Sequence, residues 1–454
     1  MIYILMIGLC ILLFISFILN KKDLIAPSFI FCASFCFSCI WAVAYAKEWE
    51  LGLHMNTFWV IFGGVLEFII ISFIVQEYFR LIKGNKSIKE NTQLSKIKIE
   101  NWKKIVFLIF CIFTILYTIY SIVHLMNGNF NNIAESISSY NSAKKFSDEI
   151  ISLPTLLIYS RYIVNAAGYW FAYVFINNYL IDKKIDFLSV AIVIMSLISS
   201  MTTGGRNGAV NIVLGCIAIF ILLMNRKAGF VKSIRFKTLV RFVIIFVIII
   251  CAFQGIGSIL GRKSSSSTYT NSMDYLATYC GAEIKNLDLF LQEGNLISDK
   301  IWGSETFIYI IRWLGPKFGI ENSYYSLTLP FRTINGFDLG NVYTTFYPYI
   351  YDFGYIGLVC LVGLMAIIVQ WVYEKCKRVK LKKSPTMCIL IYGYIFSSIV
   401  LSFFSNKFYE QNFNKTFIYL MICWIIFDIF FCKLKFVKNR GDKNCDTEKE
   451  DRRI

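Results

Sequence analysis

The chain is divided into apolar runs of about 18 to 22 residues, the length that an α-helix needs to cross the hydrocarbon core of a bilayer. Hydrophobic residues make up 57% of the 454 residues, and charged residues make up only 17%. A soluble domain is closer to about half apolar and about a quarter charged, so this surplus cannot be buried in one globular core. A soluble enzyme, a disordered protein and a secreted disulfide scaffold are therefore excluded. The sequence predicts an all-α, polytopic transmembrane helical bundle.

The apolar runs predict about eleven spans. The first run, Ile2–Leu19, lacks the basic flank and the small-residue cleavage site of a signal peptide, so we expect it to be a retained helix. The predicted spans are 2–20, 24–45, 57–76, 104–125, 153–176, 186–202, 208–224, 239–259, 354–373, 386–404 and 414–432.

The basic residues predict the orientation of these spans. Alternate connections, starting after the first span, hold 32 of the 46 Lys and Arg residues. Lys and Arg concentrate in cytoplasmic loops, so the C-terminus is expected inside and the N-terminus outside. The net charge of +17 then follows from topology and does not indicate nucleic-acid binding.

The longest connection, 260–353, falls on the outer side in this scheme. It is rich in aromatic and aliphatic residues, which argues against disorder. We expect short helices there that lie on the outer membrane face and cover the bundle. The predicted organisation is spans one to eight over 1–259, the large loop over 260–353, three further spans over 354–432 and a cytoplasmic tail over 433–454.

No recognisable soluble catalytic motif occurs in the sequence. The chain has no P-loop, no dinucleotide-binding glycine fingerprint, no HExxH and no G-x-S-x-G. Its two histidines, His54 and His124, are expected at helix ends. Cysteines such as Cys32 and Cys36 lie in apolar runs, where Cys behaves as a small hydrophobic residue. We therefore expect neither a metal nor a cofactor.

The segment Met201–Gly208, MTTGGRNG, separates two apolar runs at the predicted outer face. Its paired glycines allow a tight turn, and Arg206 lies where cations are otherwise scarce. Arg grips phosphate groups with two hydrogen bonds, and the next helix would add N–H groups that attract anions. An anion site for phosphate or pyrophosphate is one interpretation. A re-entrant turn with a snorkelling Arg is the other.

Further arginines are candidates for the same anion. Arg161 lies inside the fifth predicted span, with Asn165 one turn below it, and a charge at that depth is costly. An alternative role for Arg161 is an ion pair with an acidic residue of the loop. The large loop contributes Arg262, Arg312 and Arg332.

The segment Gly340–Gly357, GNVYTTFYPYIYDFGYIG, is dense in tyrosine and ends at the ninth predicted span. Tyr rings stack on sugars, although a single interfacial Tyr is commonly a membrane anchor. The candidate sugar-binding residues are Asn341, Tyr343, Thr344, Tyr347 and Tyr349. Asp352 is the first candidate for a catalytic carboxylate, and Glu283 is the second. A helix cap or an ion pair with an arginine is the structural alternative for Asp352.

The whole arrangement resembles the Wzy-type O-antigen and capsule oligosaccharide repeat-unit polymerases. The resemblance rests on the TTGGRNG turn (202–208), the large outer loop, and above all the segment NVYTTFYPYIYDFGYIG (341–357). It implies transfer of a growing glycan from undecaprenyl pyrophosphate to the terminal sugar of a new lipid-linked unit, outside a bacterial cytoplasmic membrane.

The resemblance also implies roles for the candidate residues. Arg206, with Arg161, Arg262, Arg312 and Arg332, would bind the leaving pyrophosphate and stabilise its charge. Asp352 or Glu283 would act on the acceptor hydroxyl. The expected partners are lipid-linked oligosaccharides and membrane lipid, with a chain-length regulator and a flippase as further candidates, and no nucleic acid.

Two other functions remain open from the sequence. A glycan ligase of similar architecture usually has a His in the large loop, and 260–353 contains none. A flippase or exporter of lipid-linked oligosaccharide usually has little mass outside the membrane, which the long loop argues against.

Overall fold

The computed structural model describes residues 1–84, 93–146, 151–230, 272–293, 302–319 and 329–434. The described part is almost entirely helical, and its strands form one two-stranded hairpin. The long helices are α1 (Ile2–Leu19), α2 (Pro27–Ala44), α3 (Met55–Lys83), α5 (Asn101–Leu125), α7 (Thr155–Asp182), α8 (Phe187–Met201), α9 (Asn207–Lys227), α14 (Phe346–Arg378), α15 (Met387–Val400) and α17 (Lys415–Phe427).

The prediction of an all-helical membrane bundle is confirmed. Among the described residues, seven helices are long and apolar enough to cross a membrane: α1, α2, α3, α5, α9, α14, and α17 with its π-helical extension to Lys433. Helices α8 and α15 are apolar but shorter. Helix α7 is 28 residues long but more polar. Ten predicted spans coincide with described helices, and the eighth, 239–259, lies outside the described residues, so the count of eleven stays a prediction.

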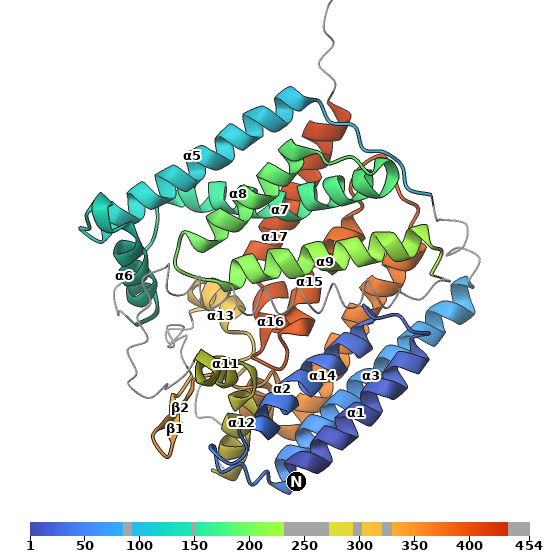
Figure 1. Cartoon of the computed structure of the whole chain (residues 1–454), viewed down its shortest axis with the longest axis vertical. Coiled ribbons are helices and arrows are strands. Elements are labelled where there is room, and N and C mark those ends of the chain that lie inside the picture. The colour runs from blue at the N-terminus through green and yellow to red at the C-terminus, as the bar shows by residue number, and fades with distance from the viewer. Residues whose placement is uncertain (85–92, 147–150, 231–271, 294–301, 320–328, 435–454) are drawn as a thin grey trace, which may run out of the picture.

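The segments that connect the helices lie at two opposite ends of the bundle (Figure 1). At one end, which we call the basic end, lie residues 20–26, 93–100, 183–186, 228–230, 379–386 and 434. Contacts that join these segments include Lys96 with Asp182, Lys104 with Asp186, Lys103 with the Leu434 carbonyl, Arg226 with the Val379 carbonyl and Ser95 with the Lys382 carbonyl. Connections that the sequence assigned to the same side therefore meet.

Short elements gather at the other end, which we call the loop end. They are α6 (Ile133–Phe146), α11 (Ser272–Cys280), α12 (Ala282–Gln292), α13 (Ile308–Leu314), α16 (Lys407–Asn412) and the strands β1 (Arg332–Ile334) and β2 (Phe337–Gly340). The hairpin turn is Asn335–Gly336 with positive φ at both residues, as an Asn-Gly turn between antiparallel strands requires.

Helix α12 anchors the loop end to the bundle. The Asn286 amide donates to the Leu339 and Val342 carbonyls at 3.2 and 2.8 Å. The buried Asp288 carboxylate accepts hydrogen bonds from the His54 N–H at 3.0 Å and the Thr57 hydroxyl at 2.6 Å, which caps the first turn of α3. The short helices are thus tied to the transmembrane part by buried polar contacts.

Helix α14 begins earlier than the sequence predicted. It starts at Phe346 and is broken at Gly354, whose φ of 66° and ψ of −164° are not helical. The predicted boundary at 354 is therefore a break within a helical segment. Residues 346–350 are buried because this first part enters the bundle, where Phe346 stacks on Phe35 with ring centroids 5.0 Å apart.

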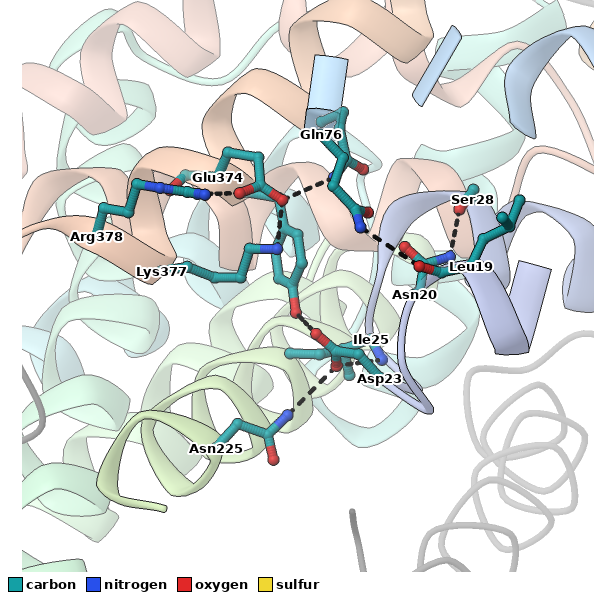
Figure 2. A network of polar contacts seen from close by, with 12 residues as sticks. Leu19, Asn20, Asp23, Ile25, Ser28, Gln76, Asn225, Glu374, Lys377 and Arg378 are labelled. Atoms are coloured by element: carbon teal, nitrogen blue, oxygen red, sulfur yellow. Dashed lines mark hydrogen bonds and ion pairs between the residues drawn. The ribbon is translucent and has the colours of Figure 1, made fainter. Parts of the chain in front are cut away.

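A polar network fixes the helices at the basic end (Figure 2). Asp23, in the turn between α1 and α2, accepts hydrogen bonds from the Asn225 amide at 3.3 Å and from the Tyr373 hydroxyl. Next to Tyr373 in α14, the fully buried Glu374 pairs with Lys377 and Arg378. The contacts of Asp23 with Asn225 and Tyr373 therefore join the first turn to α9 and α14.

Candidate functional site

A cavity of about 310 Å³ opens at the loop end between α6, α7, α8 and α9. Its volume is at the lower end of the range of ligand pockets. The residues that line it are Tyr140, Lys144, Ile151, Ser152, Leu153, Ile158, Arg161, Tyr162, Asn165, Ser199, Ser200, Thr203 and Gly208. Two of them are cationic and, among the described residues, none is acidic. The cavity is suited to an anion.

Arg161 is held in place by hydroxyl groups. Its guanidinium donates to the Thr202 hydroxyl at 2.6 Å and to the Thr203 hydroxyl at 3.4 Å. Two of the five N–H donors of an arginine are thereby used. Within the described residues, the hydrogen bonds of Arg161 go to hydroxyl groups, and neither an Asp nor a Glu pairs with it. Orientation by neutral hydroxyls leaves the positive charge available to a ligand.

Lys144 and Asn165 complete the polar lining. Lys144 comes from α6 and lines the cavity. Loss of water at the cavity wall, together with the neighbouring Arg161 charge, lowers the pKa of Lys144. The Oδ1 atom of Asn165 is buried and has no hydrogen-bond partner among the described residues. Two like charges that face one cavity repel each other, and a bound anion removes that cost.

The turn between α8 and α9 brings α6 to this cavity. Gly204 has a φ of 77°, and a Cβ atom there would lie 2.6 Å from Asn141 Cβ and 3.1 Å from the Ile137 carbonyl. Only glycine allows both the left-handed conformation and the close approach of α6. The sequence predicted the tight turn at Gly204 and Gly205, but it did not predict α6 as the partner of the turn.

Arg206 lies beside the cavity and does not line it. It is the N-cap residue of α9, is buried, and donates from Nη2 to the Tyr275 hydroxyl of α11 at 2.8 Å. Arg206 thus links the TTGGRNG turn to the short helices of the loop end. Arg161 and this turn, which the sequence assigned to one anion site, do come together.

The other candidate arginines are elsewhere. Arg332 forms a two-pronged ion pair with Glu293 and donates from Nε to the Tyr343 hydroxyl at 3.1 Å. Arg312 lies in α13. Arg262 lies outside the described residues. The structure therefore brings neither Arg312 nor Arg332 into the lining of the cavity.

The two candidate carboxylates differ in their surroundings. Asp352 accepts hydrogen bonds from the backbone N–H groups of Glu305 and Thr306, at 3.2 and 2.6 Å, and so holds the segment before α13. Glu283 is fully buried, and neither of its oxygens has a partner among the described residues. Burial raises the pKa of Glu283 well above its ordinary value.

The candidate sugar-binding residues of the tyrosine segment are mostly packed inside the protein. Tyr343, Thr344, Tyr347 and Tyr349 are buried, and Asn341 is half-buried. The rings of Tyr343 and Tyr347 are tilted by 35° with centroids 4.5 Å apart, and the Tyr349 hydroxyl donates to Asn406 Oδ1 at 3.1 Å. In this conformation these side chains stabilise the start of α14.

The fold and the cavity define a multi-pass membrane protein with a cationic pocket between its helices. The family model for O-antigen polysaccharide polymerase Wzy matches residues 1–280. The chain belongs to this family, whose members are glycosyltransferase-type polymerases of polysaccharide biosynthesis. No curated protein and no solved structure matches the chain.

The matched range includes the whole lining of the cavity, and with it Arg161 and the TTGGRNG turn. The tyrosine segment 341–357 lies beyond it. The sequence analysis did not predict that Tyr140, Lys144 and Tyr162 line the cavity. The only signal in the sequence was the polar stretch that includes Lys144, which precedes the fifth predicted span.

Proposed function

We propose that the protein polymerises undecaprenyl-pyrophosphate-linked oligosaccharide repeat units into O-antigen or capsular polysaccharide. The loop end would face the outer side of the bacterial cytoplasmic membrane. The observation that carries this proposal is the cavity, whose lining contains Arg161 and Lys144 and no acid among the described residues. Membership of the polymerase family supports the type of reaction.

In the proposed reaction the cavity binds the pyrophosphate of the donor lipid. The bond between the anomeric carbon and the phosphate oxygen breaks, and the acceptor hydroxyl oxygen forms the new glycosidic bond and loses its proton. The pyrophosphate gains negative charge as it leaves. Arg161, oriented by Thr202 and Thr203, would stabilise that charge because it is fixed before the reaction starts.

The remaining candidate residues have proposed supporting roles. Arg206 would hold α11 next to the anion and add positive charge at the start of α9. Asp352 remains the proposed carboxylate for the acceptor hydroxyl, oriented by the Glu305 and Thr306 N–H groups. Arg262, Arg312 and Arg332 would act on parts of the substrate outside the cavity, as would the tyrosine segment if it rearranges on binding.

The cavity's role is tested by replacing Arg161. In a strain that carries the variant as its sole copy, Arg161→Met should reduce polymer at least about tenfold, because a charge-assisted hydrogen bond contributes roughly 1.5–3 kcal/mol. Arg161→Lys should restore little, since a point charge cannot reproduce the guanidinium fork. The measurement is the length ladder of the glycan, normalised to protein abundance.

Arg80 provides a matched control for Arg161. It is a half-exposed arginine at the basic end and forms an ion pair with Glu77, one turn away on the same helix. Arg80→Met should leave the ladder unchanged. Full-length polymer from Arg161→Met at normal abundance would remove the cavity from the mechanism.

Deletion of the gene separates the candidate functions. Loss of a polymerase should leave single carrier-linked units that have reached the outer face. Loss of a ligase would leave long chains on the carrier, and loss of a flippase would leave units on the inner face. Long carrier-bound chains in the deletion strain would contradict the polymerase assignment.

A further inference from the structure

Three tyrosines form an aromatic cluster at the loop end, next to the cavity. Tyr159 and Tyr162 come from α7, and Tyr419 comes from α17. The rings of Tyr162 and Tyr419 are nearly parallel, at 14°, with centroids 5.5 Å apart. Tyr159 stands edge-on to both, at 72° and 82°, and its hydroxyl is 3.5 Å from that of Tyr419. We call these three residues the tyrosine platform.

The tyrosine platform and the cavity share a residue. Tyr162 lines the cavity, next in sequence to Arg161. Tyr159 is 42% exposed, and Tyr162 and Tyr419 are half-exposed. Tyr159 and Tyr419 each lie about one turn from the loop end of their helix, close to the depth of Arg161. If the anionic group of a ligand occupies the cavity, the part of the ligand adjacent to that group therefore contacts the tyrosine platform.

The platform rests on packed aromatic residues. Phe417 stacks on Tyr394 with centroids 4.8 Å apart, Tyr394 contacts Tyr169, and Tyr169 contacts Trp424. The Trp424 indole donates to the Ala166 carbonyl of α7 at 2.9 Å. These contacts fix α17 against α7, so the rings that face outwards are held in a defined geometry before any ligand binds.

Membrane anchoring alone does not account for the cluster. Interfacial tyrosines serve as anchors wherever a span meets the headgroup region, without a need to touch one another. Here three rings from two helices converge at the edge of a cavity that carries positive charge. Their faces are electron-rich, and a sugar ring presents a face of C–H groups that packs on such a surface. Their hydroxyls can also bond sugar hydroxyls.

We propose that the tyrosine platform binds the sugar attached directly to the pyrophosphate of the lipid-linked donor. This inference rests on the proposed function, because it places the pyrophosphate in the cavity. The platform selects for a carbohydrate next to the anion, while Arg161 and Lys144 bind the anion itself. Carrier lipid with a sugar should therefore bind more tightly than carrier lipid without one.

The test compares two ligands with the purified protein in lipid nanodiscs. One is undecaprenyl pyrophosphate without sugar, and the other is the carrier-linked repeat unit extracted from the deletion strain. Tyr162→Leu and Tyr419→Leu should weaken binding of the sugar-carrying lipid about two- to twelvefold, the range expected for loss of an aromatic contact. Tyr419 does not line the cavity, so Tyr419→Leu should leave binding of bare undecaprenyl pyrophosphate unchanged, which also shows that the cavity is folded in that variant.

Two further variants make the result specific. Tyr162→Phe keeps the ring and should retain most of the preference for the sugar-carrying lipid. Tyr3→Leu removes an exposed tyrosine from the start of α1, away from the cavity, and should change neither affinity. If Tyr162→Leu and Tyr419→Leu bind both lipids as the unchanged protein does, the platform is an anchor only and the inference is wrong.

The design separates this inference from the proposed function. If Arg161→Met binds bare undecaprenyl pyrophosphate normally, or if the deletion strain accumulates no carrier-linked units, the proposed function fails and the inference fails with it. If Arg161→Met loses the bare lipid while the leucine variants keep their preference for the sugar, only the inference fails.

Discussion

At the scale of single residues, Glu283 is a fully buried carboxylic acid, and neither of its oxygens has a hydrogen-bond partner among the described residues. An ionised carboxylate in such a position is very unfavourable, so the group stays protonated in the folded protein. Its folded pKa is raised above the unfolded value. The associated stability is fully present below the unfolded pKa and is lost as the pH rises through the folded pKa.

Glu283→Gln should therefore flatten the dependence of stability on pH. Above the unfolded pKa of about 4.3, the unchanged protein loses up to about 1.4 kcal/mol per pH unit from this group for as long as the folded carboxyl stays protonated while the unfolded one ionises. The variant lacks the titrating group and should show a smaller slope. The measurement is the apparent melting temperature in detergent at several pH values; equal slopes for the two proteins would contradict the assignment of a neutral buried acid.

The residues of the site were only partly predictable from the sequence. The sequence predicts that Arg161 and the TTGGRNG turn lie close together. Arg161 lies near the outer end of the fifth predicted span, and the turn lies at the outer end of the sixth. Lys144 and Tyr162 were not found. Lys144 reaches the cavity because α6 packs against the end of α5 and against the α8–α9 turn. Interfacial tyrosines such as Tyr162 are indistinguishable in sequence from membrane anchors.

At the scale of elements, the fit between the α8–α9 turn and α6 depends on one glycine. Gly204→Ala adds a Cβ that collides with Asn141 and the Ile137 carbonyl, at a residue with positive φ. We expect a cost of about 1–3 kcal/mol. Displacement of α6 would also move Lys144, so affinity for bare undecaprenyl pyrophosphate should fall along with the melting temperature.

The neighbouring residue supplies the control for Gly204. Gly205 has no positive φ, and nothing lies within 4 Å of the position that a Cβ atom would take there. Gly205→Ala should therefore be close to neutral in both measurements. Equal effects at the two positions would show that the turn tolerates a side chain, and that α6 is not positioned by Gly204.

The elements themselves were largely predictable, and their exact ends were not. Hydropathy located the helices because a membrane demands long apolar runs. It placed the start of α14 at 354, although the helix begins at Phe346. The tyrosines and Pro348 of this segment are typical of a loop, but a proline is tolerated in the first turn of a helix, where Pro348 lies. Burial of the surrounding rings stabilises that turn.

At the scale of the whole molecule, the two ends of the bundle carry different charges. If the basic end is cytoplasmic, reporter fusions after Lys98 and Lys380 should be active in the cytoplasm. Fusions after Asn129 and Asn335 should be active outside, because both residues lie at the loop end. A cytoplasmic signal after Asn335 would invert the topology and would place the cavity on the wrong side for lipid-linked units that have crossed the membrane.

The cavity is built from one short stretch of chain, residues 140–208, whereas the tyrosine platform adds Tyr419 from the last helix. In the proposed arrangement, the residues that would bind the anion all lie in this stretch, whereas the residues that would contact the sugar are divided between it and α17. Recombination between related genes, with a breakpoint after α15, would exchange part of the sugar contacts and leave the anion grip intact. Under the proposed function, such an exchange would alter the sugar that is accepted while the residues proposed to bind pyrophosphate stay the same.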